Sequence, residues 1–251
     1  INIARDPRWG RTQEGYGEDP FLVSRIAVEY IKGLQGKDDK YIKAIASPKH
    51  FVANNVDGDR HFTNSKIDDK ILRDYYFPAF ESSIVEGKAQ GLMSAYNSLN
   101  SIPCSSNDFL LNKILRNEWG FKGHVVSDCG AVYNIHANHF FVETPHQGVA
   151  IALKSGTDMN CGGQYEKYLK EVFEIGLVNE MDIETSLKRI LRSRFLLGMF
   201  DHPSLVPYSK ISEDVIDSRK HRLLAKEVAL ESIVLLKNEN NFLPISKDLG
   251  S

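Results

Sequence analysis

The feature that most limits the possible folds of this chain is a regular alternation of short apolar runs and longer amphipathic segments. Apolar or β-branched runs at 1–4, 44–47, 91–97, 123–127 and 156–160 are typical of buried strands. Helical periodicity is found over about 20–36, 69–84, 108–119, 145–154, 165–175, 182–197 and 218–231. Strands and helices that alternate at this spacing form a parallel sheet, so the sequence predicts an α/β fold.

The loops that follow the predicted strands are polar, and this favours one kind of α/β architecture. No Gly-x-Gly-x-x-Gly turn follows a strand, so a dinucleotide-binding fold is not indicated. In a TIM-type (β/α)8 barrel the loops after the strands form the functional face. We therefore predict such a barrel. Because it needs eight strands and five are predicted here, we expect it to be incomplete at its N-terminus.

Composition excludes two classes of partner. The 251 residues are 42% hydrophobic and 25% charged, as in ordinary globular proteins. With 31 basic and 33 acidic residues and no long run of one sign, the chain lacks the basic surface of a nucleic-acid binder. Its apolar runs are shorter than the roughly 18 residues of a membrane span. We expect neither nucleic acid nor membrane as a partner.

One predicted strand ends in an acid. Segment 123–130 (GHVVSDCG) is a glycine-flanked β-branched run that delivers Asp128 at its C-terminal end. A carboxylate there serves chemistry, or it caps the helix that follows. Segment 123–130 by itself leaves both interpretations open.

Other polar residues lie at or after the C-terminal ends of the predicted strands: Arg11, Lys49, His50, Arg60 and Tyr96. In a barrel they would share one mouth with Asp128. A carboxylate among such cations stays ionised at neutral pH, which suits a nucleophile or an electrostatic stabiliser better than a general acid. The many donors suit a ligand rich in hydroxyl groups.

Each of these residues also has a structural interpretation. Lys49 and His50 could form a surface pair, and Tyr96 could be a core residue with a satisfied hydroxyl group. Arg60 could form a salt bridge with Asp57 or Asp59.

The cysteines and histidines give weaker signals. Three cysteines do not make a disulfide framework, so Cys129 and Cys161 are either two buried thiols or a bridge formed in an oxidising compartment. His136, His139 and His146 hint at a metal but have no HExxH order, so surface histidines are favoured. We expect no metal and no cofactor.

Taken together, the chain resembles glycoside hydrolase family 3, the β-glucosidase and β-xylosidase family. The matching segments cover nearly the whole chain in order: 5–11 (RDPRWGR), 18–20 (EDP), 49–51 (KHF), 93–97 (MSAYN), 126–128 (VSD), 235–238 (LLKN) and 243–244 (LP). The resemblance implies that the chain is a fragment of the N-terminal barrel domain of such an enzyme.

The resemblance also implies site roles. Asp128 would be the nucleophile of a retaining mechanism, in which a second carboxyl group about 5–5.5 Å away serves as acid and base. Arg11, Lys49, His50, Arg60 and Tyr96 would hold the sugar nearest the cleaved bond, and Met93 lines that subsite in some members.

In this family the acid/base usually comes from a second, α/β-sandwich domain. We therefore expect 1–231 to be the partial barrel and 232–251 to be a linker with the start of that missing domain. A sugar-binding aspartate of the family lies upstream of Ile1 and is also missing. The chain alone is expected to be a weak enzyme.

The activity that the resemblance implies is exo-acting removal of terminal β-linked xylose or glucose from the non-reducing end of oligosaccharides. Segments 127–129 (SDC) and 160–163 (NCGG) favour xylose. One alternative is a truncated sugar-binding barrel with weak chemistry. Another, a β-N-acetylglucosaminidase-type member, would need an Asp-His dyad pattern that segment 49–55 (KHFVANN) lacks. A periplasmic or secreted location is favoured over a cytoplasmic one.

Overall fold

The computed structural model describes residues 1–246 and contains two compact units, Ile1–Val206 and Pro207–Ser251. The described strands are β1 (Asn64–Ser65), β2 (Gly91–Ser94), β3 (Ser98–Leu99), β4 (Ile102–Pro103) and β5 (His124–Ser127). The first unit also contains the helices α1 (Pro20–Gln35), α2 (Asp69–Ile71), α3 (Pro78–Val85), η4 (Phe109–Glu118), α4 (Ala131–Ala137), α5 (Pro145–Lys154), α6 (Gln164–Glu174) and α7 (Glu180–Leu196).

Strands β2 and β5 form the centre of the first unit. They are parallel, with Met93 opposite Val126 and Ser94 opposite Ser127. Parallel bridges continue the pairing on both sides, from Ser94 to Phe51 and from Val126 to Met159. Extended segments therefore lie side by side in the order of the sequence, and the predicted α/β fold is confirmed. The closed eight-stranded barrel stays a prediction.

Only some of the predicted strands form regular strands in the structure. Those at 91–97 and 123–127 are confirmed by β2 and β5, whereas 44–47 and 156–160 contribute only isolated bonds or bridges. The carbonyl of Ala46 still accepts a hydrogen bond from the N–H of Gly91 at 3.0 Å. Segment 1–4 is not a strand, because its side chains rather than its backbone make most of its bonds to the neighbouring segment.

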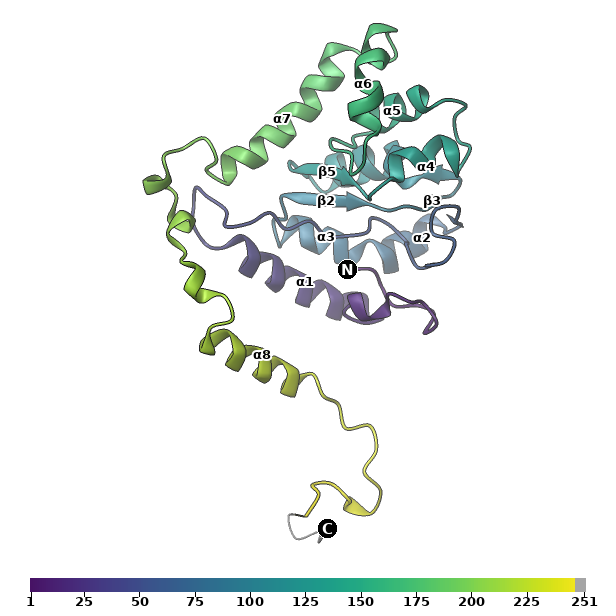
Figure 1. The fold of residues 1–251 in the computed structure, drawn as a ribbon. Helices are drawn as coiled ribbons and strands as arrows, with labels where there is room; N and C mark the ends of the chain where they lie inside the picture. The colour runs from purple at the N-terminus through teal and green to yellow at the C-terminus, as the bar shows by residue number, and fades with distance from the viewer. Residues whose placement is uncertain (247–251) are drawn as a thin grey trace. The chain divides into compact units, whose positions relative to one another are not determined.

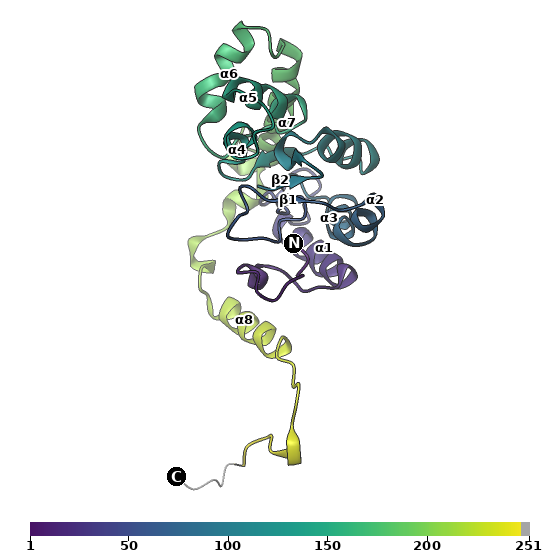
Figure 2. The ribbon, with the colours of Figure 1, turned by 90° about the vertical axis from the view of Figure 1, so that its right-hand side faces the viewer.

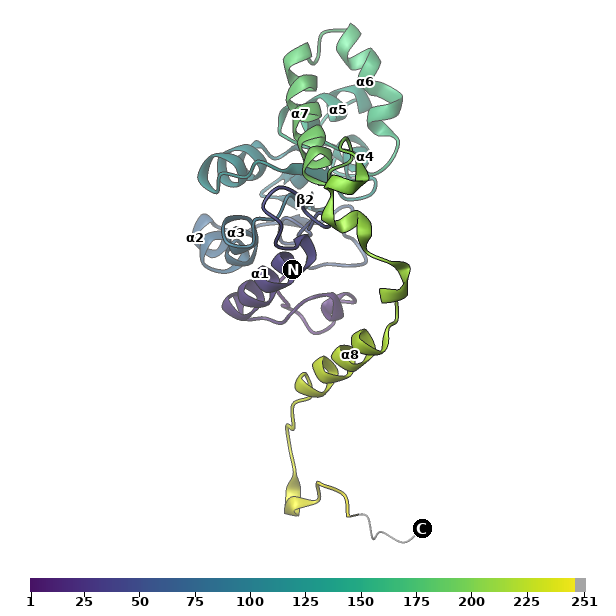
Figure 3. The same ribbon diagram turned by 90° about the vertical axis from the view of Figure 1, so that its left-hand side faces the viewer.

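Helices lie on both sides of the β2–β5 pair. In Figure 1, α1 and α3 lie on one side of the two strands and α4 to α7 lie on the other. The two side views in Figures 2 and 3 show the same separation. Each group of helices covers its own hydrophobic core, one around Phe51, Leu92 and Val125 and one around Ile135 and Val149.

The ends of the helices follow from local side-chain chemistry. The carboxylate of Asp19 accepts a hydrogen bond from the N–H of Phe21 at 2.8 Å, which caps α1 as predicted. Helix α1 ends at Gly36, whose φ of +85° is left-handed and strains residues with a side chain. Asn179 and Asp182 form a capping box that starts α7.

Two elements differ from the sequence prediction. Helix α4 lies outside the ranges of helical periodicity in the sequence and follows the left-handed turn at Gly130 (φ +86°). A small sheet of strands β1, β3 and β4 also forms within the polar loops after Phe51 and β2. Its strands have two residues each, too short to give a period-two pattern.

A buried ion network holds the strands against their helices. The carboxylate of Asp158 is fully buried and binds Arg116 of η4 at 2.7 Å and Arg189 of α7 at 2.9 Å. Its Oδ2 also accepts a hydrogen bond from the N–H of Val125 in β5 at 2.8 Å. Burial lowers the pKa of Arg116 to about 10, which still leaves the guanidinium charged at neutral pH.

The second unit contains helix α8 (Arg219–Glu231), capped by the hydroxyl of Ser218. Farther along, the side chain of Asn238 exchanges two hydrogen bonds with the backbone of Leu243, at 2.9 and 3.0 Å. The predicted domain boundary after residue 231 and the linker over 232–251 stay predictions, and residues 247–251 lie outside the described residues. Within residues 1–246, none of the helices combines the length and the apolar character needed to cross a bilayer.

Replacing Asp158 should destabilise the first unit strongly. Asp158→Ala leaves two arginines without their buried counter-charge, which costs about 3–5 kcal/mol of unfolding free energy. Urea unfolding measures this. The control Asp74→Ala removes an exposed pair with Lys70 and should change stability by less than about 1 kcal/mol. Equal effects of the two substitutions would contradict the network's role.

Candidate active site

The candidate site lies where the parallel segments end. Asp128 directly follows β5, Tyr96 lies two residues after β2, and His50 precedes the bridge residue Phe51. Because parallel strands end at the same edge of a sheet, the three side chains are brought together from distant parts of the sequence. His50 Nε2 lies 3.4 Å from Asp128 Oδ2.

The two carboxylate oxygens of Asp128 differ in their hydrogen bonding. Oδ1 accepts a hydrogen bond from the N–H of Cys129 at 2.8 Å. Oδ2 is buried and has no hydrogen-bond partner among residues 1–246. A buried carboxylate oxygen without a donor is costly, so a structural role alone does not explain it. The fold fixes one oxygen and leaves the other available.

Helix capping does not account for Asp128. Helix α4 has Gly130 as its N-cap, and within the described residues it receives no capping bond from a side chain. The donor to Asp128 is Cys129, which lies before the helix. The capping interpretation is therefore wrong for this carboxylate.

His50 is a neutral group in this site. Its backbone N–H and its Nδ1 both approach Oδ1 of Asn2, at 3.0 and 2.9 Å. Because that oxygen only accepts, Nδ1 carries the proton, and Nε2 accepts a hydrogen bond from Arg11 Nη2 at 3.2 Å. Burial, followed by the charges of Arg11 and Lys49, lowers the pKa of His50 to about 3. Its contact with Asp128 is therefore not an ion pair at neutral pH.

Arg11 links this cluster to a second carboxylate. Its Nε and Nη2 donate to the two oxygens of Glu14 at 2.9 and 2.8 Å. This bond lowers the pKa of Glu14. Glu14 and, more weakly, Asp128 raise the pKa of Arg11. Arg11 is thus a fixed cation that interacts electrostatically with both Glu14 and Asp128.

Tyr96 lies beside the backbone of the Asp128 loop. Its hydroxyl donates to the carbonyl of Cys129 at 2.9 Å. The guanidinium of Arg60 lies 5.6 Å from the centre of the Tyr96 ring, and the ring of His61 packs edge-on at 4.5 Å. Burial, and next the charge of Asp128, raise the pKa of Tyr96. Its hydroxyl therefore keeps its proton at neutral pH.

The other predicted residues lie around this cluster. Arg60 donates to the carbonyl of Asp57 at 2.9 Å and lies 3.5 Å from its carboxylate, so the pairing with Asp57 is present. Lys49 is exposed, and its charge lowers the pKa of His50 and Glu14. Met93 is half-buried on β2.

Sequence reasoning missed several supporting residues. Asn2 holds His50, and Ser127 accepts hydrogen bonds from Asn160 Nδ2 and from the N–H of Cys161, at 3.3 and 3.1 Å. Asn134 lies 2.8 Å from the ring of His61. The one available signal was Asn2 itself, a polar residue between two isoleucines in an apolar run.

The structure decides whether Cys129 and Cys161 are free thiols or a bridge. Cys129 and Cys161 form a disulfide, with Cα atoms 4.3 Å apart, while Cys104 is free and buried. The bridge joins the ends of two neighbouring extended segments, where the N–H of Gly130 also donates to the carbonyl of Cys161 at 2.7 Å. It therefore fixes the peptide that holds Asp128.

The three histidines that hinted at a metal, His136, His139 and His146, lie in different surroundings. His139 contacts Ser98 and the carbonyl of Tyr96, whereas His146 pairs with Glu171. His136 packs edge-on against Tyr133. Within residues 1–246, no cluster of three or more His, Cys, Asp or Glu side chains is arranged to hold a metal ion.

The class that these observations define is a parallel α/β domain with a carboxylate, an arginine, a histidine and a tyrosine gathered where its extended segments end. Residues 1–193 match the Glycosyl hydrolase family 3 N terminal domain. The chain belongs to glycosyl hydrolase family 3.

Curated relatives cover the whole chain. Xylan 1,4-beta-xylosidase of Xylanibacter ruminicola is 42% identical over 254 residues, covering 99% of this chain and 29% of that protein. Probable beta-D-xylosidase 7 of Arabidopsis thaliana is 39% identical over 259 residues, covering 98% and 34%. This chain therefore spans about a third of the length of these relatives.

Solved structures share the fold. A GH3 exo-beta-xylosidase in complex with a xylobiose aziridine activity-based probe has a TM-score of 0.93 and 37% identity, covering 98% of this chain and 33% of that one. A beta-glucosidase from Erythrobacter marinus has a TM-score of 0.90 and 35% identity, with coverage of 98% and 33%.

The buried neutral state of His50 predicts a pH dependence. Below pH about 6.5 the unfolded chain binds a proton at His50 that the folded chain excludes until its pKa of about 3. The unfolding free energy of the native chain should therefore fall, relative to that of His50→Gln, by about 1.5 kcal/mol between pH 6.5 and 5.

Urea unfolding at a series of pH values measures this difference. The control His221→Gln changes an exposed histidine of α8 and should leave the pH dependence as in the native chain. A constant difference between the native chain and His50→Gln across this range would show that His50 is not held neutral.

Proposed function

We propose that the protein containing this chain is a retaining exo-glycosidase that removes terminal β-linked xylose or glucose, with Asp128 as its nucleophile. The observation that carries the proposal is the buried Oδ2 of Asp128, which lacks a partner among residues 1–246 at the end of β5. Such an oxygen is free to attack an anomeric carbon, while the Cys129 N–H holds the other one.

The neighbouring side chains support a sugar subsite. Arg11, Arg60 and Lys49 supply cationic donors, and Tyr96 supplies a protonated hydroxyl. His50, fixed by Asn2, presents Nε2 to the same space. Met93 on the half-buried face of β2 would give an apolar contact with the sugar ring. A rigid set of donors suits an oxocarbenium-like transition state, whose stabilisation provides much of the catalysis.

A second carboxyl group is needed to protonate the leaving oxygen. Within residues 1–246, the nearby acids Glu14 and Asp57 are paired with Arg11 and Arg60, and the pair with Arg11 keeps Glu14 ionised. Neither suits a general acid. We propose that the acid/base comes from another part of the protein, consistent with relatives about three times as long as this chain. The first unit would then be part of a TIM-type barrel.

The proposed substrate class and location draw on different observations. The relatives named xylosidases favour xylose, and those named glucosidases keep glucose as the second choice. A disulfide persists in oxidising compartments, which favours secretion or the periplasm. The free Asp128 oxygen does not favour a purely sugar-binding role.

A trapped intermediate tests the nucleophile. A 2-deoxy-2-fluoro-β-xyloside with a dinitrophenolate leaving group needs no acid. Asp128 Oδ2 forms a bond to the anomeric carbon as the bond to dinitrophenolate breaks, and the leaving group takes the electron pair. Mass spectrometry of digests from the full-length protein and from this chain should place one fluoroxylosyl group on Asp128.

Matched variants complete the test. Asp128→Asn should abolish the labelling, whereas Asp57→Asn should keep it. A label on another residue of the full-length protein would overturn the proposed nucleophile, and so would labelling that survives Asp128→Asn.

A further inference from the structure

A basic cavity lies on the opposite edge of the strands from Asp128. It has a volume of about 540 Å³ and is formed between η4, the loop before β5, and α7. Its cationic lining residues, here called the basic pocket, are Arg116, Lys122, Lys188, Arg189 and Arg192. Of the residues within 1–246 that line it, none is acidic.

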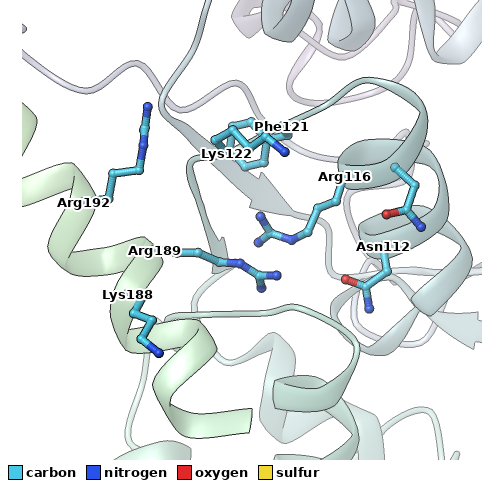
Figure 4. Close-up of a pocket in the computed structure, with 8 residues that line it drawn as sticks. Asn112, Arg116, Phe121, Lys122, Lys188, Arg189 and Arg192 are labelled. Carbon is cyan, nitrogen blue, oxygen red and sulfur yellow. The ribbon is translucent and has the colours of Figure 1, made fainter. Parts of the chain in front are cut away.

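The cations come from elements far apart in sequence and converge. Figure 4 shows the guanidinium groups of Arg116 and Arg189 pointing toward one another between η4 and α7, with Lys122 above them. The side chain of Arg116 is only 8% exposed, and its Nε has no hydrogen-bond partner among residues 1–246. The Nη atoms of Arg116 donate to the carbonyls of Gly123 and Gly156 and to Asp158, so this guanidinium is held rigidly beside the cavity.

The charges of the pocket are only partly compensated. Asp158 binds Arg116 and Arg189, and Glu184 pairs with Lys188 on the exposed face of α7. Arg192 donates to the neutral side-chain oxygen of Gln90. Lys122 has no ion-pair partner among residues 1–246. Two cations that line the cavity, Lys122 and Arg192, therefore have no acidic partner among residues 1–246.

We propose that the basic pocket binds a phosphate dianion, either free or as the ester of a small molecule. A dianion would neutralise most of this excess positive charge, and guanidinium groups suit the oxygens of phosphate. The volume falls within the range of small-molecule sites, so the pocket has room for an organic group attached to the phosphate.

This site does not depend on the proposed glycosidase activity. Gln90 and Lys122 precede β2 and β5, whereas Tyr96 and Asp128 follow them, so the pocket and the candidate active site lie at opposite ends of the same strands. A phosphate in the pocket should therefore bind together with a sugar at Asp128 rather than compete with it.

Titration calorimetry of the 251-residue chain tests the proposal, at constant ionic strength set with chloride. One arm uses inorganic phosphate and the other uses glycerol 3-phosphate. Both should bind saturably. Tighter binding of glycerol 3-phosphate identifies an ester site, and equal or tighter binding of inorganic phosphate identifies a site for the free ion.

Variants assign the binding to the pocket. Lys122→Gln and Arg192→Gln should each weaken binding roughly tenfold, because each removes a charge-assisted contact. Lys122→Gln breaks no ion pair among residues 1–246, so its folding is the safer case. The matched control Arg194→Gln changes an exposed arginine of α7 that does not line the pocket, and it should bind as the native chain does.

Two results would overturn the proposal. One is the absence of saturable binding of either probe below roughly 10 mM, the weak end of specific affinities. The other is binding that Lys122→Gln and Arg192→Gln leave unchanged, or that Arg194→Gln weakens equally, because the phosphate would then lie elsewhere.

Discussion

The parallel pairing of β2 with β5 is the interaction on which the candidate site depends. Its register sets Ser94 opposite Ser127, so the chain leaves both strands at the same edge and brings Tyr96 and Asp128 together. The neighbouring bridge at Phe51 brings in His50. A slip of one residue would turn every side chain of the slipped strand to the other face and separate the site residues. The burial of Leu92 and Val125 opposes such a slip and therefore also holds the site together.

Two aspartates near the same strands, Asp158 and Asp128, differ in how completely their carboxylate oxygens are paired. Asp158 has two arginines and a backbone N–H on its carboxylate, and every oxygen is satisfied. Asp128 has one backbone N–H on Oδ1, and its Oδ2 is left without a partner among residues 1–246. Burying an unpaired carboxylate oxygen costs stability, and the proposed role of Asp128 as a nucleophile would account for this cost.

The sequence predicted what depends on local pattern. The α/β class, the capped start of α1 and the strands at 91–97 and 123–127 follow from periodicity and turn chemistry. The gathering of His50 and Tyr96 near Asp128 followed from their places beside paired segments, whereas Arg11 joins them although residues 1–4 do not form a strand. The two-residue strands, helix α4, and the support from Asn2 could not be predicted, because they depend on contacts between distant segments. The bridge between Cys129 and Cys161 stayed an open alternative for the same reason.

In the proposed mechanism, Asp128 forms a covalent bond to the sugar on the face opposite the leaving group. Chemical rescue of a variant that lacks this carboxylate tests for that bond. In the full-length protein, Asp128→Gly should lose activity on dinitrophenyl β-xyloside, and azide should restore it by occupying the space of the lost carboxylate. The expected product is α-xylosyl azide, because azide attacks from the nucleophile's side. Formation of β-xylosyl azide, or no rescue by azide, would contradict it.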